Sequence, residues 1–294
     1  MNRKLALGPR IAIYTVMTLI CLICIIPIIT VVSISLSTDM RIIKEGYGIL
    51  PRGLTLDAYK YALKDGAAIL RSYGVSIFVT VVGTVGGLLL NSMLAYVLAR
   101  KNYRYQKQLT IYILIPMVLS GGMVPTYLWI SSYLDLKNTI WVLILPLMVV
   151  PWFTILLRTF FSQVPGELLE AATVDGAGEL TIFFKVMVPL AKPALATVAM
   201  FLALSYWNDW FWCLMYIDNS ELYTLQYRLY IMMKDVQEMI KNAAMSGMGI
   251  GIADLPTESM RMAMCVIAAG PMLMIFPFFQ KYFVKGLTVG GVKG

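Results

Sequence analysis

Four carboxylates, spaced along a short polar stretch between two long apolar runs, are the residues whose chemistry is most informative in this chain. They are Glu167, Glu170, Asp175 and Glu179. Because an ionised carboxylate is costly inside lipid, we expect this stretch to lie outside the bilayer. The chain contains no histidine, which excludes imidazole acid–base chemistry and histidine metal ligation. Apolar residues separate the carboxylates, and this spacing favours contact with a partner protein over catalysis.

A second polar group lies inside a long apolar run. Asn208 and Asp209 are flanked by Trp207 and Trp210, with Trp212 nearby. Aromatic faces stack on sugar rings and carboxamides bond hydroxyl groups, so Trp207, Asn208, Asp209 and Trp210 are candidates for a sugar pathway. The tryptophans are also typical of an aromatic belt at the outer interface of a membrane, and the sequence leaves both interpretations open. A carboxylate such as Asp209 within a span marks either a pathway or a contact between helices.

The elements that position these residues are membrane spans. Of the 294 residues, 59% are hydrophobic and 14% are charged, whereas soluble domains carry about 25% charged residues. Six apolar runs approach or exceed the roughly 20 residues that a helix needs to cross the hydrocarbon core. They cover residues 11–33, 73–99, 109–131, 139–161, 190–217 and 262–284. We therefore predict an all-α polytopic membrane protein with six transmembrane helices in a single domain, residues 1–294.

The N-terminal tail is basic and precedes the first apolar run, as in a secretory signal peptide. The run at 11–33 is longer than the roughly 7–15 residues of a signal-peptide core, and no small-residue cleavage site ends it. We expect a retained signal-anchor span. Within the second run, Gly83, Gly86 and Gly87 are expected to let neighbouring helices approach closely.

Basic residues predict the orientation of these spans. The short loop at 100–108 holds four basic residues and no acidic one. In a six-span topology this loop falls on the same side as both tails, which are also basic. The positive-inside rule then places both termini, this loop and residues 165–189 in the cytoplasm. The outer side receives two longer loops, 34–72 and 218–261.

The net charge of +8 is explained by these cytoplasmic segments. No run of basic residues interleaved with aromatic residues projects from a soluble face, so nucleic-acid binding is not predicted.

Residues 165–189 are predicted to form a helix, a turn and a second helix. Pro165 and Gly166 end the preceding helix, and proline is well placed to start the next one. Asp175-Gly176 is a turn signal, because glycine readily adopts the positive φ that ends a helix. The alternative is an interfacial hairpin that only links two spans. Such anchors usually carry basic residues on the polar face, and the acidic residues found here favour a protein partner.

This segment resembles the EAA loop of binding-protein-dependent ABC importer permeases. The residues that carry the resemblance are Glu170-Ala171-Ala172, Asp175-Gly176-Ala177 and Val188-Pro189-Leu190. The family pattern ends in Leu-Pro, where this chain has Val-Pro. Trp207-Asn208-Asp209 and residues 157–161 and 280–294 are similar to the carbohydrate-uptake branch. Residues 121–127 and 255–262 are similar to the Gram-positive subgroup for complex oligosaccharides, so the resemblance covers nearly the whole chain.

The resemblance implies a type I ABC importer permease fold and a subunit that translocates a sugar or oligosaccharide. In that family the EAA loop is a coupling helix that docks into a cleft on a cytoplasmic ATPase dimer. It therefore implies the ATPase-coupling residues Glu170, Ala171, Ala172, Asp175 and Gly176. A six-span subunit forms half of a pathway, so a second permease subunit is expected, either another copy of this chain or, as is usual in the sugar branch, a different chain. The resemblance also implies an extracellular sugar-binding lipoprotein that meets the outer loops. The expected location is a bacterial cell membrane, in contact with lipid.

The sequence has no Walker A pattern, GxxxxGK[ST], so ATP is expected to bind the partner subunit. No catalytic residue, cofactor or metal site is predicted in this chain. One alternative is an ion-coupled secondary transporter, which normally needs buried carboxylates or histidines, and only Asp209 qualifies. Another is a transferase acting on lipid-linked sugars, which needs clustered acidic residues at a membrane face. The residues favour the permease.

Overall fold

The computed structural model describes residues 7–100, 102–245 and 257–290. Within them every regular element is helical, apart from an isolated β-bridge between Ser37 and Leu54. The all-α prediction is therefore confirmed. Parts of the predicted loops 100–108 and 218–261, and of the segments 255–262 and 280–294, lie outside the described residues.

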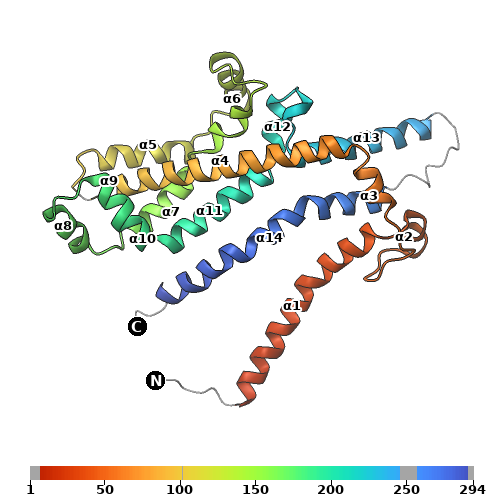
Figure 1. The fold of residues 1–294 in the computed structure, drawn as a ribbon, viewed down its shortest axis with the longest axis horizontal. Helices are drawn as coiled ribbons and strands as arrows, with labels where there is room; N and C mark the ends of the chain where they lie inside the picture. The colour runs from red at the N-terminus through yellow and green to blue at the C-terminus, as the bar shows by residue number, and fades with distance from the viewer. Residues whose placement is uncertain (1–6, 101, 246–256, 291–294) are drawn as a thin grey trace. The chain divides into compact units, whose positions relative to one another are not determined.

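The chain divides into two compact units, and the first contains Met1–Gly66 and Leu229–Pro271. Its elements are α1 (Leu7–Ser35), α2 (Asp39–Glu45), α3 (Asp57–Ala62), most of α13 (Leu225–Met245) and the first part of α14 (Glu258–Gly290) (Figure 1). Apolar side chains of α1 are exposed along nearly its whole length, from Ile11 to Val32. This all-round apolar surface is typical of a helix in contact with lipid.

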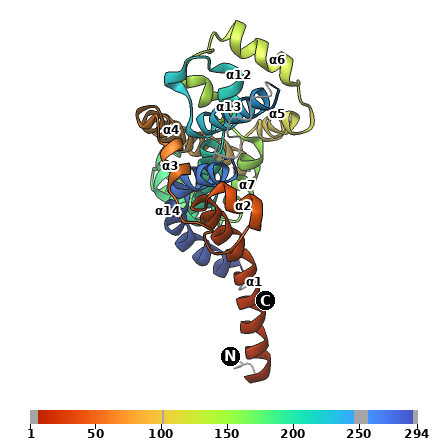
Figure 2. The same cartoon turned by 90° about the vertical axis from the view of Figure 1, so that its right-hand side faces the viewer.

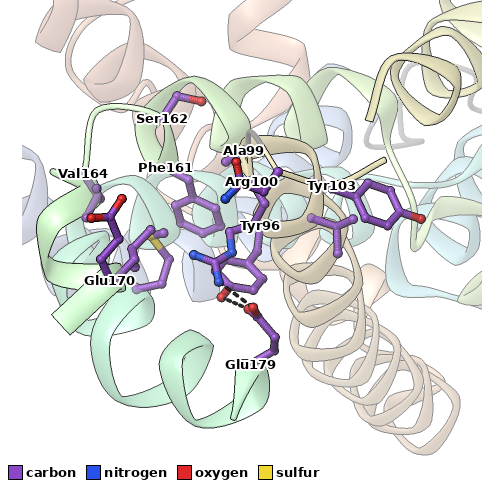
Figure 3. Close-up of a pocket in the computed structure, with 14 residues that line it drawn as sticks. Tyr96, Ala99, Arg100, Tyr103, Phe161, Ser162, Val164, Glu170 and Glu179 are labelled. Carbon is purple, nitrogen blue, oxygen red and sulfur yellow. Dashed lines mark hydrogen bonds and ion pairs between the residues drawn. The ribbon is translucent and has the colours of Figure 1, made fainter. Parts of the chain in front are cut away.

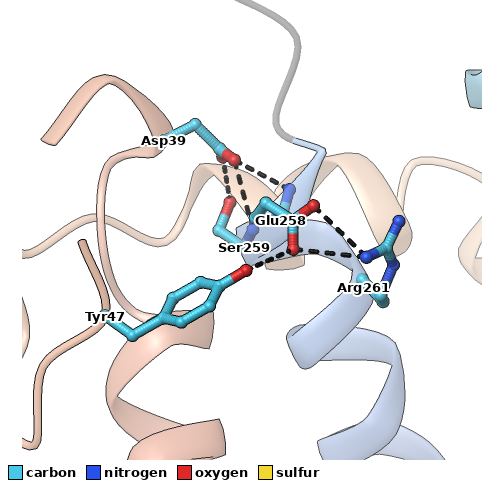
Figure 4. Close-up of polar contacts among 5 residues, drawn as sticks. All are labelled: Asp39, Tyr47, Glu258, Ser259 and Arg261. Carbon is cyan, nitrogen blue, oxygen red and sulfur yellow. Dashed lines mark hydrogen bonds and ion pairs between the residues drawn. The ribbon is translucent and has the colours of Figure 1, made fainter. Parts of the chain in front are cut away.

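Asp39 caps the start of α14 within this unit (Figure 4). Its Oδ1 accepts hydrogen bonds from the backbone N–H groups of Glu258 at 2.8 Å and Ser259 at 3.3 Å, and its Oδ2 accepts one from the Ser259 hydroxyl. Glu258 in turn accepts a hydrogen bond from Tyr47 at 3.2 Å and pairs with Arg261 at 3.2 Å. A carboxylate at a helix N-terminus contributes about 1 kcal/mol. These contacts tie the predicted outer loop 34–72 to the start of α14.

The second unit contains Ala67–Arg228 and Met272–Gly294. It begins with the long helix α4 (Gly66–Ala99) and continues through shorter elements, several of them π or 3₁₀ turns. They are α5 (Gln106–Val118), α6 (Met123–Leu128), η1 (Trp129–Tyr133), η2 (Ile140–Leu143), η3 (Leu145–Leu147), α7 (Pro151–Phe161), α8 (Gly166–Val174), α9 (Glu179–Ile182), η4 (Phe183–Met187), α10 (Val188–Leu190), α11 (Lys192–Trp207), α12 (Phe211–Tyr216) and η5 (Ser220–Leu222). The α6 and α12 helices are adjacent in both views (Figures 1 and 2), and the rings of Tyr127 and Tyr216 stack at 5.3 Å.

Three helices of the described residues are long and apolar enough to cross a bilayer: Ile11–Ser35, Gly66–Ala99 and Glu258–Ile275. The other predicted spans are broken. Gln106–Val118 bends by 114° into Met123–Tyr133, and Ile140–Leu147 by 45° into Pro151–Phe161. In the predicted span 190–217, α11 ends at Trp207 and α12 starts at Phe211. Glu179–Leu190, which belongs to the predicted cytoplasmic segment, bends by 87° into Lys192–Trp207 at the start of that span. The total reaches six only if each bent pair is counted as one span, so the six-span topology stays a prediction.

Proline and glycine account for two of these breaks. Gly122 has a φ of +85°, which an L-residue adopts at a cost. Val150, before Pro151, is extended with φ −110° and ψ 111°, because proline disfavours the helical conformation of the preceding residue. The backbone opened beside Pro151 is satisfied by buried Asn91 of α4. Its amide donates to the carbonyls of Gly87 and Met148 and accepts from the Val150 N–H and the Thr154 hydroxyl, at 2.6–3.1 Å.

Glycines of α4 bring that helix against its neighbours, as the sequence predicts. A Cβ atom added at Gly83 would lie 2.4 Å from the Tyr206 ring of α11, and one at Gly87 would lie 2.9 Å from the Met148 carbonyl oxygen. Tyr206 is 2% exposed, and its hydroxyl donates to the Ile144 carbonyl at 2.9 Å. The ring therefore has no free space into which it can move.

We expect Gly83→Ala to destabilise the chain by about 1–3 kcal/mol, the usual cost of overpacking a close contact. Gly74→Ala is the matched control in the same helix, because a Cβ there meets no atom within 4 Å and alanine is the better helix former. Thermal unfolding of the purified protein in detergent measures both. Equal melting temperatures for the two variants would contradict the packing described here.

Candidate functional site

Residues 165–189 form the helix-turn-helix that the sequence predicts. α8 ends at Val174, Gly176 follows with a φ of +79°, and α9 begins at Glu179. The second helix continues through the π turn η4 to α10 and the bend into α11. We refer to residues 165–189 as the hairpin.

The turn of the hairpin is a Schellman motif. The Ala177 N–H donates to the Ala172 carbonyl and the Gly176 N–H donates to the Thr173 carbonyl, both at 3.0 Å. This pairing requires a residue with positive φ after the helix, and glycine supplies it at little cost. A Cβ at Gly176 would meet no atom within 4 Å. Backbone conformation rather than space therefore makes glycine necessary at this position.

The first helix of the hairpin is open to its surroundings. No residue of α8 is buried, and Leu168 and Val174 are 46% and 87% exposed. Glu167 and Glu170 are exposed, and no ion pair within the described part of the chain holds either of them. α8 therefore exposes apolar and acidic side chains that the rest of the unit does not cover.

The second helix of the hairpin is anchored to the rest of the unit. Ile182, Phe183 and Met187 are at most 2% exposed. The Glu179 carboxylate accepts hydrogen bonds from the Tyr96 hydroxyl and from Arg100, which lie at the C-terminal end of α4 and just beyond it (Figure 3). The hairpin thus presents α8 outward on a fixed base.

A cavity of about 620 Å³ separates α8 from this base (Figure 3). Leu169 and Glu170 line it on the α8 side. The opposite walls come from the ends of α4 and α7 and from η4, and include Tyr96, Arg100, Phe161 and Met187. The cavity lies beside α8, whereas the second helix of the hairpin packs directly on the rest of the unit.

The predicted pathway residues lie at a break in the fifth apolar run. α11 ends at Trp207 and α12 starts at Phe211. Trp207 is buried, 3% exposed, with its ring 6.3 Å from that of Tyr73. Asp209 Oδ1 accepts a hydrogen bond from the Trp212 N–H at 3.4 Å, and its backbone oxygen accepts one from the Thr224 hydroxyl at 3.2 Å. Asp209 therefore supports the start of α12, a role that sequence reasoning did not separate from a pathway role.

Asn208 and Trp210 have a different environment from these two residues. Both are exposed, and Trp210 is 40% accessible. Of the four predicted residues, these two are exposed, whereas Asp209 is partly exposed and Trp207 is buried.

Sequence reasoning missed the partners of Glu179 and the role of Asn91. Tyr96 and Arg100 lie 83 and 79 residues away from Glu179 in the sequence, and Asn91 bonds residues 57 to 63 positions away. No local pattern marks such pairs. The only available signal was chemical: each is a polar residue in or beside an apolar run and therefore needs a partner.

The family of binding-protein-dependent transport system inner membrane components matches residues 75–289, well over half of the chain. The chain belongs to this family. The resemblance inferred from the EAA-like residues is thereby confirmed, and the hairpin lies within the matched region.

Curated relatives of this permease are similar over most of their length. Protein LplC of Bacillus subtilis (strain 168) is 40% identical over 260 residues, which cover 88% of this chain and 86% of that protein. The polygalacturonan/rhamnogalacturonan transport system permease protein YtcP of the same strain is 36% identical over 264 residues, covering 88% of this chain and 89% of that protein.

A solved structure has the same fold. A chain from the crystal structure of a bacterial ABC transporter involved in the import of the acidic polysaccharide alginate aligns with a TM-score of 0.78 and 28% identity. The alignment covers 96% of this permease and all of that chain. This chain is therefore a membrane component of an ABC import system with the type I permease fold, and its family works with ATPase and binding-protein partners.

Proposed function

We propose that this permease subunit translocates a sugar or oligosaccharide that an extracellular binding protein delivers and a separate cytoplasmic ATPase drives. The observation that carries the proposal is the exposed α8 helix on a buried base. The relatives' names support a carbohydrate substrate, since they include polygalacturonan, rhamnogalacturonan and alginate transport. Membership of the family favours ATP-driven import over the ion-coupled alternative.

We assign the coupling contact to Glu170, Ala171, Ala172, Asp175 and Gly176. Ala171 and Ala172 have side chains small enough for a partner surface to approach the helix closely. Glu170, exposed on α8, meets a basic residue of the ATPase. Gly176 keeps the turn that fixes the direction of α8, and Asp175 ends the helix beside it.

A rigid base is needed if an ATPase movement is to reach the spans. Interfaces and packed elements transmit displacements when they move as bodies rather than deform. The buried Ile182, Phe183 and Met187 give the second helix of the hairpin that rigidity. The bend of 87° between Glu179–Leu190 and Lys192–Trp207 is the point where the hairpin passes into α11.

The proposed topology has six spans in one multi-pass domain, residues 1–294, in a bacterial cell membrane. Both termini, the loop 100–108 and the hairpin lie in the cytoplasm, and the loops 34–72 and 218–261 face outward. The proposed assembly contains an ATPase dimer, a second and different permease subunit and a sugar-binding lipoprotein that meets the outer loops.

We place the solute pathway at the α11–α12 break. The exposed Asn208 carboxamide bonds sugar hydroxyls, and the exposed Trp210 ring stacks on a sugar face. Trp207 and Asp209 shape this break through their contacts with Tyr73 and Trp212.

Affinity purification of the tagged chain from its native membrane tests this proposal. We expect mass spectrometry of the eluate to identify an ATPase, a second permease and, after mild crosslinking, a solute-binding protein. A tagged chain that elutes alone, and that in proteoliposomes moves solute down an ion gradient without ATP, would contradict it.

A further inference from the structure

Glu179 joins two segments of the second unit that are distant in sequence (Figure 3). Its Oε2 accepts a hydrogen bond from the Tyr96 hydroxyl, and its Oε1 accepts one from Arg100 Nη2 at 2.5 Å. The Arg100 guanidinium carbon also lies 5.6 Å from the centroid of the Tyr96 ring. We call these three residues the clamp. Each carboxylate oxygen of Glu179 has its own donor, so the clamp fixes both the position and the orientation of the start of α9.

The clamp lies on a packed joint between α4 and the second helix of the hairpin. Tyr96 is 6% exposed and Phe183 is 2% exposed, and their rings are 5.4 Å apart. Arg100 and Glu179 sit at the edge of this joint, with side chains 26% and 62% exposed. The apolar part of the joint holds the elements in contact, and the polar part sets their angle.

Among the described residues, α8, the other helix of the hairpin, has no comparable tie to α4. The cavity of about 620 Å³ lies between them, and no residue of α8 is buried. A partner that displaces α8 would therefore move it into this cavity unless the hairpin were held elsewhere. The described contacts that hold it run through α9 and η4.

Residues of α4 that precede the clamp contact other elements of the same unit. Gly83 packs on Tyr206 of α11, and Asn91 bonds the backbone on both sides of the break before α7. A displacement passed to the end of α4 would therefore act on two of the bent segments. Coupling between distant sites is carried by such contiguous packed and hydrogen-bonded groups.

We propose that the clamp is the joint through which movement of the hairpin is passed to α4, with Glu179, Tyr96 and Arg100 as positioning residues. The inference rests on the proposed function, since it assumes an ATPase that moves α8. Ion pairs with an exposed partner contribute little to folding stability. Loss of the clamp should therefore loosen the joint without unfolding the chain.

Interlabel distances in the assembled complex test the joint directly. Spin labels are attached to cysteines replacing exposed Leu180 of α9 and exposed Asn102 beyond α4, in a chain whose four native cysteines are replaced by alanine. Distances are measured in the nucleotide-free complex and with ATP and vanadate. With the clamp intact, we expect one narrow distribution that stays in place when nucleotide is added. With Glu179→Ala, we expect the distribution to broaden and to shift on adding ATP and vanadate.

A charge swap and a distant ion pair provide the controls. Arg100→Glu and Glu179→Arg should each broaden the distribution, and the double variant should restore the narrow one. Glu221→Ala removes the ion pair with Arg71 near the other end of α4, whose side chains are 53–58% exposed, and should change nothing. ATP hydrolysis per unit of solute taken up should rise in Glu179→Ala, because part of each hairpin movement is lost at the loosened joint, and should stay at the parent value in Glu221→Ala.

Two outcomes separate the joint from the proposed function. In the first outcome the ATPase binds, but the interlabel distances of Glu179→Ala equal those of the parent chain, or the charge swap fails to restore the narrow distribution. The joint is then refuted, while the coupling role of α8 stands. If no ATPase binds even the parent chain, the proposed function fails, and the joint with it.

Discussion

A Glu170→Lys chain is expected to reach the membrane in normal amount and to lose both its ATPase and all ATP-driven uptake. Glu170 is exposed, and surface changes of this kind usually alter folding stability by no more than about 0.5 kcal/mol. In the docked complex, however, the lysine would face a basic residue of the partner. Like charges brought together in an interface cost several kcal/mol, which corresponds to association weakened by about 100-fold or more. Co-purification of the ATPase and the amount of chain in membranes are the two measurements.

Asp235→Lys is the matched control for this charge reversal. Asp235 is an exposed carboxylate on the helix α13, which lies in a predicted outer loop. The control should retain the ATPase at the level of the parent chain, and Glu170→Gln should retain an intermediate amount. Full ATPase retention by Glu170→Lys would remove Glu170 from the contact, and equal loss in both lysine variants would mean that the effect is not local.

Gly176→Pro should abolish uptake while leaving membrane insertion intact. Proline fixes φ near −65°, whereas Gly176 has a φ of +79°. Proline also removes the N–H that Gly176 donates to Thr173. The Schellman turn cannot form with proline there, so the chain must leave the end of α8 in another direction. Because no residue of α8 is buried, the effect should be misdirection of α8 rather than unfolding. Uptake and ATPase co-purification are measured together.

Two alanine variants make the prediction specific. Gly176→Ala leaves the N–H in place but strains the positive φ by about 1–2 kcal/mol, so it should reduce uptake partially. Gly178→Ala lies two residues away with a φ of −69°, and its Cβ meets no atom within 4 Å. It should transport normally. Normal uptake by Gly176→Pro, or equal effects at Gly176 and Gly178, would argue against the turn as part of the coupling contact.

The hairpin was predictable because its signals are local. Pro165, Gly166, Asp175 and Gly176 each act on the backbone within a few residues, and the helix-turn-helix follows from them. The same holds for the glycines of α4, whose lack of a side chain directly favours close packing. Residue types and their short spacing are therefore enough to predict both the hairpin and the close packing of α4.

The bends of the apolar runs could not be derived in the same way. Hydrophobicity measures whether a segment tolerates lipid, and it is the same for a straight helix and for one bent by 114° between α5 and α6. Pro116, Pro146 and Pro151 lie in the runs that bend, and a proline permits a kink without fixing its size. The bend angle depends on distant groups such as Asn91, which satisfies the broken backbone near Pro151. Contacts of this kind have no signature in the local sequence.

The clamp and the pathway residues show the same limit. The sequence identifies Glu179 and Asp209 as carboxylates that need an explanation, but it does not give their partners. The structure shows that Tyr96 and Arg100 donate hydrogen bonds to Glu179. The backbone N–H of Trp212 donates one to Asp209. The family relationship then supplies what neither geometry nor composition contains, which is the class of transport system.

In the proposed assembly, α8 is held from inside the cell by a separate ATPase. Site-specific photocrosslinking from Ala171, which is exposed on α8, tests it most directly. We predict a single major adduct with an ATPase subunit in native membranes, together with protection of a cysteine at this position from an impermeant thiol reagent added to intact cells. Labelling of that cysteine from outside the cell, with no ATPase adduct, would contradict the account.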